Sequence, residues 1–157
     1  MKIEHLYQIF LKSKKVITDS RIAENNALFF ALKGENFNGN VYAKNALENG
    51  CSFAIVDNPD YVQGDNYILV DDVLETLQLL GNYHRKQLNI PIIAITGTNG
   101  KTTTKELVAA VLNMKYNITF TKGNLNNHIG VPLTILSMDK ETQIGIVEMG
   151  ANHLYEI

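Results

Sequence analysis

The chain has 157 residues, of which 45% are hydrophobic and 19% charged, and its formal net charge is −2. This length suits one ordinary domain or two small ones, and the composition excludes disordered and fibrous proteins. The weak negative charge argues against nucleic acid as a partner. No apolar run approaches the ~20 residues of a membrane span, and the N-terminus is too polar for a signal peptide. The single cysteine, Cys51, permits no intrachain disulfide, so we expect a cytoplasmic protein.

The first half of the chain predicts alternating strands and helices. Apolar and aromatic runs closed by turn residues predict three strands, at residues 28–34, 52–57 and 67–72. Residues 41–50 predict a short helix that ends at Gly50. A longer helix is predicted from its N-cap Asp72, because apolar residues recur at helical spacing, and it must end before Pro91. We place a domain boundary between residues 89 and 90.

The second half repeats the alternation. The fully apolar run at residues 92–96 predicts a strand buried on both faces of a parallel sheet. Residues 101–112 predict a helix with Leu107, Val108, Val111 and Leu112 on one face. Further elements are predicted in the order strand, helix and strand, at residues 117–121, 129–137 and 143–149. This order is typical of a doubly wound α/β sheet. Because only three strands are present and residues 153–157 look like the start of a helix, we expect this chain to be a piece of a longer protein.

A glycine-rich turn, "GTNGKT" at residues 97–102, follows the apolar strand. A Walker phosphate loop also ends in Gly-Lys-Thr, but its first glycine lies two positions earlier than Gly97 does here. The shorter loop can still bind phosphate. Gly97 and Gly100 permit positive φ, and the loop N–H groups can converge on an anion at a helix N-terminus. Lys101 would place its charge at the β- and γ-phosphates, and the Thr102 hydroxyl could bind Mg²⁺. The alternative is a glycine turn with a surface lysine.

The loop "GTNGKTTT" resembles the ATP-binding loop of the Mur ligase family, the ATP-dependent amide ligases of peptidoglycan precursor synthesis. "TKGNLNNHIGVPLTIL" at residues 121–136 and "VEMGANHLYEI" at 147–157 are similar to the central domain of the branch that adds D-alanyl-D-alanine to UDP-N-acetylmuramoyl-tripeptide. "TDSR" at 18–21 and residues 28–50 are similar to the UDP-binding domain of that branch.

The resemblance covers nearly the whole chain and implies its fold class and domains. The fold would be α/β, with a small UDP-binding domain at residues 1–89. A truncated P-loop-type, doubly wound ATP-binding domain would follow at residues 90–157. The chain departs from the family at Asn38-Gly39-Asn40, where members often carry an acidic residue, a glycine and a histidine. A second departure is Leu154-Tyr155, where a small residue is frequent.

The resemblance also implies roles for particular residues. The phosphates of ATP would be bound by the loop and the helix start, with Lys101 as the catalytic residue: Gly97, Thr98, Asn99, Gly100, Lys101, Thr102 and Thr103. Glu148 matches the acidic magnesium ligand of the family and would share Mg²⁺ with Thr102; a salt bridge at the end of a strand is the alternative. The UDP-substrate would be contacted by Ser20, Arg21, Asn126 and Asn127. For the two asparagines the alternative is capping of the next helix, and for Arg21 it is a surface turn.

The implied reaction is amide formation driven by ATP through an acyl phosphate, in an enzyme that is a monomer at full length. The partners would be UDP-N-acetylmuramoyl-tripeptide and D-alanyl-D-alanine, with ATP and Mg²⁺ as cofactors and with neither nucleic acid nor a membrane span. We expect these 157 residues alone not to ligate. Two alternatives stay open: a sibling ligase that adds a different amino acid, and a nucleotide-binding module without catalysis. Of the four histidines, only His153 is a metal candidate, and a weak one.

Overall fold

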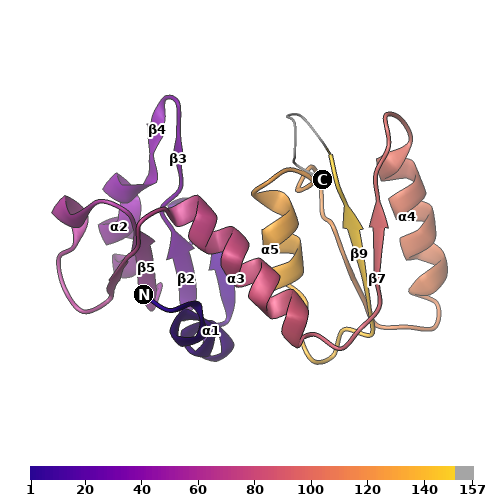
Figure 1. Cartoon of the computed structure of the whole chain (residues 1–157), viewed down its shortest axis with the longest axis horizontal. Helices are drawn as coiled ribbons and strands as arrows, with labels where there is room; N and C mark the ends of the chain where they lie inside the picture. The colour runs from indigo at the N-terminus through magenta and orange to yellow at the C-terminus, as the bar shows by residue number, and fades with distance from the viewer. Residues whose placement is uncertain (151–157) are drawn as a thin grey trace. The chain divides into compact units, whose positions relative to one another are not determined.

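The computed structural model describes residues 1–150. The chain divides into two compact units, Met1–Tyr83 and His84–Ile157, and Figure 1 shows the elements of each. The division falls within helix α3 (Val73–Gln87). Asp72 caps this helix, as predicted, by accepting a hydrogen bond of 2.7 Å from the Glu75 N–H. The boundary between residues 89 and 90 stays a prediction.

The first unit contains a four-stranded, all-parallel sheet in the order β1-β2-β5-β6. Its strands are β1 (Lys15–Ile17), β2 (Ala27–Phe30), β5 (Phe53–Val56) and β6 (Tyr67–Leu69). Its other elements are α1 (Ile3–Lys12), α2 (Ala43–Glu48), the short 3-10 helices η1 (Ser20–Ile22), η2 (Gly39–Tyr42) and η3 (Pro59–Tyr61), and the antiparallel pair β3 (Lys33–Gly34) and β4 (Phe37–Asn38). All four residues of β2 are buried, because this strand lies inside the sheet.

The predicted strand at residues 28–34 is wrong beyond Phe30. The chain leaves the sheet there, and residues 33–38 form the β3–β4 hairpin instead. Gly39 anchors the hairpin, since its N–H donates to the Leu32 carbonyl over 2.8 Å. A Cβ at Gly39 would lie 2.4 Å from that oxygen, so only glycine fits. α1 and β1 were not predicted from the sequence, while the predicted helix ending at Gly50 is confirmed as α2.

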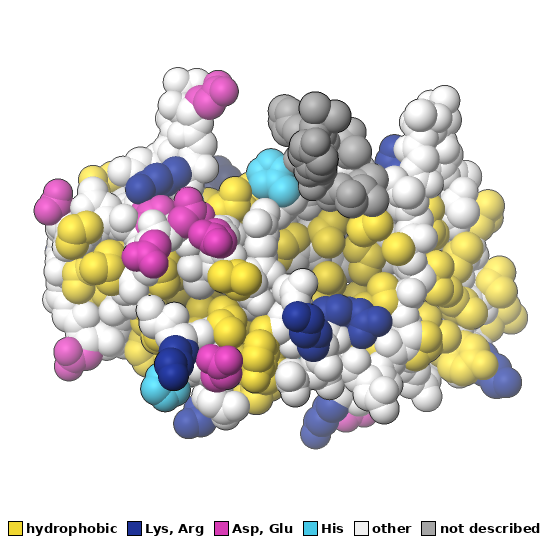
Figure 2. All heavy atoms as spheres, viewed as in Figure 1, with side chains coloured by type: hydrophobic (Ala, Val, Ile, Leu, Met, Phe, Trp, Pro, Cys, Tyr) yellow, Lys and Arg dark blue, Asp and Glu magenta, His cyan; other side chains and the backbone are white. Residues whose placement is uncertain are grey.

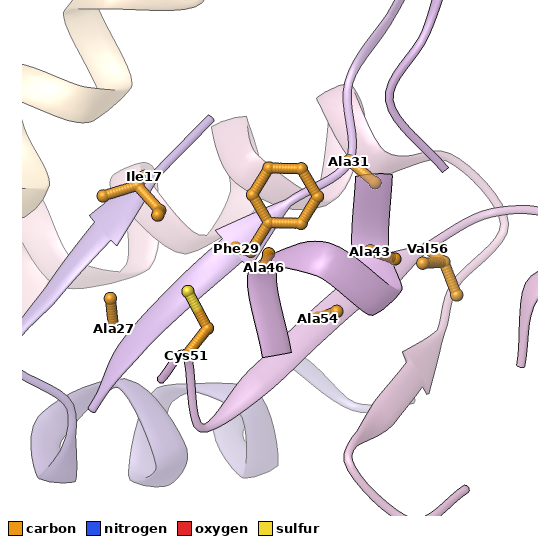
Figure 3. Packing of buried hydrophobic residues seen from close by; sticks show 9 residues of the cluster. All are labelled: Ile17, Ala27, Phe29, Ala31, Ala43, Ala46, Cys51, Ala54 and Val56. Carbon is orange, nitrogen blue, oxygen red and sulfur yellow. The ribbon is translucent and has the colours of Figure 1, made fainter. Parts of the chain in front are cut away.

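One part of the core of the first unit lies between its sheet and α2. Figure 3 shows Phe29 among small side chains from the sheet, from α2 and from the turn after it. Cys51 is a buried member of this cluster, which confirms its role as a small hydrophobe, and burial raises the pKa of its thiol. The cluster consists of Ile17, Ala27, Phe29, Ala31, Ala43, Ala46, Cys51, Ala54 and Val56.

The second unit contains a three-stranded parallel sheet in the order β7-β9-β8. Its strands are β7 (Ile92–Ile95), β8 (Ile118–Phe120) and β9 (Ile144–Glu148), and its helices are α4 (Lys101–Leu112) and α5 (Gly130–Leu136). The two helices lie on opposite sides of the sheet (Figure 1). This arrangement confirms the predicted α/β class with a doubly wound parallel sheet. The helix predicted at residues 153–157 lies outside the described residues.

Two predictions about burial in this unit are corrected. β7 is not buried on both faces, since Ile93 and Ala94 are exposed and Ile92 and Ile95 are only partly buried. In α4, Leu107 and Val111 lie on the exposed side, at 64% and 66%. Figure 2 shows hydrophobic side chains gathered over this helix. The side that packs on the sheet buries Lys105 and Ala109 instead.

His84 is buried within the second unit, in agreement with its predicted place as a surface or core residue. Its Nε2 lies 2.8 Å from the Met138 carbonyl oxygen, which fits donation of an N–H to that oxygen. Burial lowers the pKa of His84 below its ordinary 6.5, against the opposing effect of this hydrogen bond. Within residues 1–150, no helix is both long and apolar enough to cross a membrane.

Candidate functional site

The glycine-rich loop joins the carboxyl end of β7 to the N-terminus of α4, as the sequence predicts. Gly97 and Gly100 have φ angles of 144° and 75°, in the region that glycine adopts without steric cost. Gly100 is the N-cap of α4 and has no side chain with which to cap the first N–H groups of this helix. These N–H groups and the helix dipole therefore favour an anion at the loop.

Lys101 is the first residue of α4 and folds back over the loop. Its Nζ donates a hydrogen bond of 2.6 Å to the carbonyl oxygen of Gly97. This places the ammonium group over the loop, and its role as a phosphate ligand stays a prediction. The ammonium is solvent-accessible in this position, so it can turn from the carbonyl to a ligand.

Glu148 ends the central strand β9 and faces the start of α4. The carboxylate is 1% exposed, and its Oε1 accepts hydrogen bonds from Thr102 Oγ1 at 3.1 Å and from Asn126 Nδ2 at 2.8 Å. Its Oε2 is buried and has no hydrogen-bond partner within residues 1–150. The structure thus brings together the two predicted metal ligands, Thr102 and Glu148, from positions 46 residues apart.

A second charged group near Glu148, the ammonium of Lys105, was not predicted from the sequence. Lys105 is fully buried, and its Nζ lies 3.7 Å from Glu148 Oε2 and 3.0 Å from Glu106 Oε1. Glu148 is therefore both the partner of Thr102 and a member of a buried ion pair. The signal was available in part, since Lys105, Ala109 and Leu112 recur at the helical spacing of a buried face.

The two asparagines of "GNLNN" have different neighbours. Asn126 donates to Glu148 and belongs to the group around the loop. Asn127 Oδ1 accepts from the N–H groups of Ile129 and Gly130, at 3.1 and 2.9 Å, so it caps α5 as the alternative reading has it. A contact of either asparagine with substrate stays a prediction.

The residues at the loop fit a magnesium ion. Mg²⁺ prefers oxygen ligands and is usually held by one or two carboxylates, together with waters and phosphates of the substrate. The buried Oε2 of Glu148 lacks a hydrogen bond within the described chain, and the Thr102 hydroxyl beside Oε1 has lone pairs left to donate. Residues 1–150 contain no group of three His, Cys, Asp or Glu side chains of the kind that holds a metal by itself. Thr102 and Glu148 would therefore hold the ion together with nucleotide phosphates.

The predicted UDP-binding residues of the first unit lie beside a cavity of about 380 Å³. Ser20 and Arg21 belong to η1, and the rings of Phe37 and Tyr42 are stacked with centroids 5.5 Å apart. Flat, partly exposed aromatic rings beside a guanidinium suit a ligand with a planar ring and a negative charge. The cavity is lined by Thr18, Asp19, Ser20, Arg21, Phe29, Phe37 and Tyr42.

Arg21 is held in place at this cavity by Asp19. The guanidinium donates to both carboxylate oxygens, with distances from 2.6 to 3.1 Å, while 87% of the Arg21 side chain stays exposed. The hydrogen bonds from Arg21 lower the pKa of Asp19 to about 2. Arg21 therefore presents a fixed positive charge with donors left for a ligand.

The departure from the family at residues 38–40 has a structural role in this chain. Asn40 is buried, and its amide donates to Asp57 over 2.9 Å and accepts from the Asp57 N–H over 3.2 Å. Lys33 pairs with the same carboxylate at 2.7 Å. Burial opposes ionisation of Asp57, but the hydrogen bonds from Lys33 and Asn40 outweigh it and lower its pKa. Asn40 thus fixes the base of the hairpin to the end of β5.

Relatives of known name match the chain over most of its length. It is 43% identical over 144 residues to the UDP-N-acetylmuramoyl-tripeptide–D-alanyl-D-alanine ligase of Bacillus subtilis, an alignment covering 90% of this chain and 32% of the relative. The ligase of the same name from Escherichia coli is 39% identical over 142 residues, with 90% and 31% covered. The chain therefore spans about a third of the length of these relatives.

The chain is also similar in structure to solved MurF ligases. A crystal structure of MurF from Acinetobacter baumannii has a TM-score of 0.85 and 37% identity, covering 99% of this chain and 37% of that one. The structure of the MurF ligase from Thermotoga maritima in complex with ADP has a TM-score of 0.80 and 31% identity, with 92% and 33% covered.

Family models cover both halves. Residues 95–156 match the Mur ligase middle domain, and residues 13–115 match the Mur ligase family, catalytic domain. The second match alone includes more than half of the chain and extends through the glycine-rich loop. The chain belongs to the Mur ligase family.

Proposed function

We propose that this chain is part of an ATP-dependent amide ligase of peptidoglycan precursor synthesis that joins D-alanyl-D-alanine to UDP-N-acetylmuramoyl-tripeptide. One observation carries the proposal: Lys101 and Thr102 lie at a strand-to-helix loop, and Thr102 contacts the buried carboxylate of Glu148. The names of the similar proteins support the choice of substrates. The ADP complex of the Thermotoga maritima protein supports a nucleotide at the loop.

In the proposed reaction the carboxylate of the tripeptide attacks the γ-phosphorus of ATP, and ADP leaves. The amine of the dipeptide then attacks the acyl carbon, and phosphate leaves. Phosphoryl transfer of this kind requires alignment and neutralisation of charge more than covalent help from the protein. A magnesium ion held by Thr102 and Glu148 would supply part of that neutralisation.

The residues of the loop would bind the phosphates of ATP. The N–H groups of residues 97–103 would bind the phosphate oxygens, and the Lys101 ammonium would move from the Gly97 carbonyl to the phosphates. Glu148 is positioned by Thr102 and Asn126 before any ligand arrives, so little reordering would be needed.

In the first unit we propose that the cavity beside η1 binds the uridine nucleotide. Arg21 would pair with a phosphate, and the exposed faces of Phe37 and Tyr42 would stack on the uracil ring. Asn126 and Asn127 would contact the substrate from the second unit. The proposed enzyme acts in the cytoplasm and is a monomer at full length.

The binding of ADP with Mg²⁺, measured by calorimetry, tests the loop. Lys101→Ala should weaken binding by at least tenfold without lowering the melting temperature, because a lysine whose ammonium lies at the surface contributes little to a core. Lys115→Ala is the matched control, since Lys115 is an exposed lysine just beyond the same helix. Equal affinity of Lys101→Ala and the parent chain would contradict the proposal.

A turnover assay tests the reaction. ATP hydrolysis and amide product are measured with the UDP-tripeptide and D-alanyl-D-alanine, and again with the amino acids that sibling ligases add. Product with another amino acid only would support a sibling ligase. Nucleotide binding without product, in a longer protein that contains these residues, would support a module without catalysis.

A further inference from the structure

Lys105 carries its charge into the interior of the second unit, directly beneath the loop. The side chain is 1% exposed, and its Nζ donates a hydrogen bond of 2.9 Å to the carbonyl oxygen of Thr121. The ammonium also lies 3.7 Å from Glu148 Oε2 and 3.0 Å from Glu106 Oε1. Of these two carboxylates only that of Glu148 is buried, because the Glu106 side chain is 56% exposed.

Thr121 links Lys105 to Glu148 a second time. Its carbonyl accepts from Lys105, and its hydroxyl accepts from the backbone N–H of Glu148 over 2.9 Å. The backbone of Glu148 is thereby fixed by the residue that also holds the ammonium. Lys105 and Thr121 lie on one side of the Glu148 carboxylate in this network, while Thr102 and Asn126 both donate to the other oxygen, Oε1.

A buried lysine is costly unless its charge is compensated, so its presence requires a reason. α4 needs no charge on its inner side for packing, since Ala109, one turn further along, is buried without one. Lys105 instead lies beside Glu148, whose carboxylate is the one within residues 1–150 that contacts Thr102. Its Nζ attracts Glu148 Oε2 from 3.7 Å, too far for a hydrogen bond, and within residues 1–150 that oxygen accepts none.

We propose that Lys105 is a positioning residue for Glu148. The ammonium attracts Oε2 and so keeps Oε1 turned toward Thr102 and Asn126, where the carboxylate would hold a divalent cation together with Thr102. This inference rests on the proposed role of Glu148 as a ligand of Mg²⁺. Lys105 itself touches neither the cation nor the nucleotide.

Positioning of Glu148 and a simple effect of the Lys105 charge predict opposite changes in Mg²⁺-dependent binding when Lys105 is removed. If Lys105 acted only as a positive charge near the cation site, its removal would strengthen the binding of a cation, because like charges repel. If it positions Glu148, its removal must weaken Mg²⁺-dependent binding. Outer residues that orient a metal ligand typically contribute about 10- to 100-fold to metal affinity.

The test is a double-mutant cycle read by calorimetry, with ADP titrated into the chain with and without Mg²⁺. The measured quantity is the ratio of the two affinities, which reports the contribution of the cation. Lys105→Met should lower this ratio by about 10- to 100-fold and leave the affinity without Mg²⁺ unchanged. In a Glu148→Gln background, the same substitution should lower the ratio no further.

Two controls accompany the cycle. Glu106→Gln removes the exposed partner of Lys105 and should leave the ratio unchanged, as should Lys115→Met at an exposed lysine. In Lys105→Met the buried Glu148 carboxylate has no positively charged side chain beside it. If this variant does not fold for that reason, Lys105→Gln takes its place in the cycle. Its amide retains a donor for the Thr121 carbonyl.

The outcomes separate this inference from the proposed function. If Mg²⁺ does not raise the affinity of the parent chain for ADP, the role of Glu148 is overturned, and the inference with it. The same holds if Glu148→Gln leaves the ratio unchanged. A lowered ratio in Glu148→Gln alone would leave the proposed function standing and overturn the role of Lys105. A raised ratio in Lys105→Met, or an equal loss in both backgrounds, would also overturn positioning.

Discussion

Asn127 offers the sharpest test of the local structure around the site. Its Oδ1 accepts from two N–H groups at the start of α5, a helix of seven residues whose inner face is buried. Replacing an asparagine at such a cap with alanine typically costs about 1 kcal/mol. For a cooperative unit of about 60–100 residues this corresponds to a fall in melting temperature of about 4–8 °C.

Differential scanning calorimetry of Asn127→Ala measures this fall, since it resolves the transitions of the two units if they melt separately. Asn127→Asp keeps the acceptor and adds a charge that the helix dipole favours, so it should melt close to the parent. Asn124→Ala, at an exposed position in the same loop, is the control. A parent-like melting temperature for Asn127→Ala, or an equal loss in Asn127→Asp, would refute the capping argument.

Three further predictions concern the rest of the chain. Arg21→Ala should weaken the binding of UDP by about 1.5–3 kcal/mol, roughly ten- to a hundredfold, because one charge-assisted contact is lost; calorimetry showing equal affinities would remove Arg21 from the site. Since His84 has a lowered pKa when folded, the unfolded chain binds more protons near pH 6, so the melting temperature should fall as the pH drops below about 6.5; in His84→Gln this part of the decline should disappear. Gly39→Ala should destabilise the first unit by about 3 kcal/mol, because the new Cβ meets a backbone oxygen at 2.4 Å. Gly34→Ala, where the nearest atom lies at 4.0 Å, should show a much smaller loss in urea unfolding.

Several features of this chain are local and were predicted from the sequence. The loop at residues 97–102 lies between a strand and a helix because an apolar run, two glycines and a helical pattern follow one another directly. The positive φ angles of Gly97 and Gly100 and the cap of α3 by Asp72 are equally local. Each depends on interactions among residues a few positions apart, which a sequence pattern records.

The burial of the second unit was decided by tertiary structure. The apolar run of β7 predicts burial on both faces, yet Ile93 and Ala94 are exposed in the structure. Leu107 and Val111 are apolar and exposed, whereas Lys105 is charged and buried. Hydrophobic periodicity reports which side chains share a face of a helix, and the neighbours of that face decide whether it is buried.

The network around Glu148 also depends on contacts that no local pattern contains. The sequence by itself indicated Thr102 and Glu148 as separate candidates, each at the end of an element. Only the strand order β7-β9-β8 brings the end of β9 beside the start of α4, and with it Lys105 and Thr121. Parallel strands are joined through helices, so strands adjacent in the sheet are distant in the sequence. The charge that balances Glu148 was therefore set by the fold, because a buried carboxylate is stabilised by whatever group the packing places next to it.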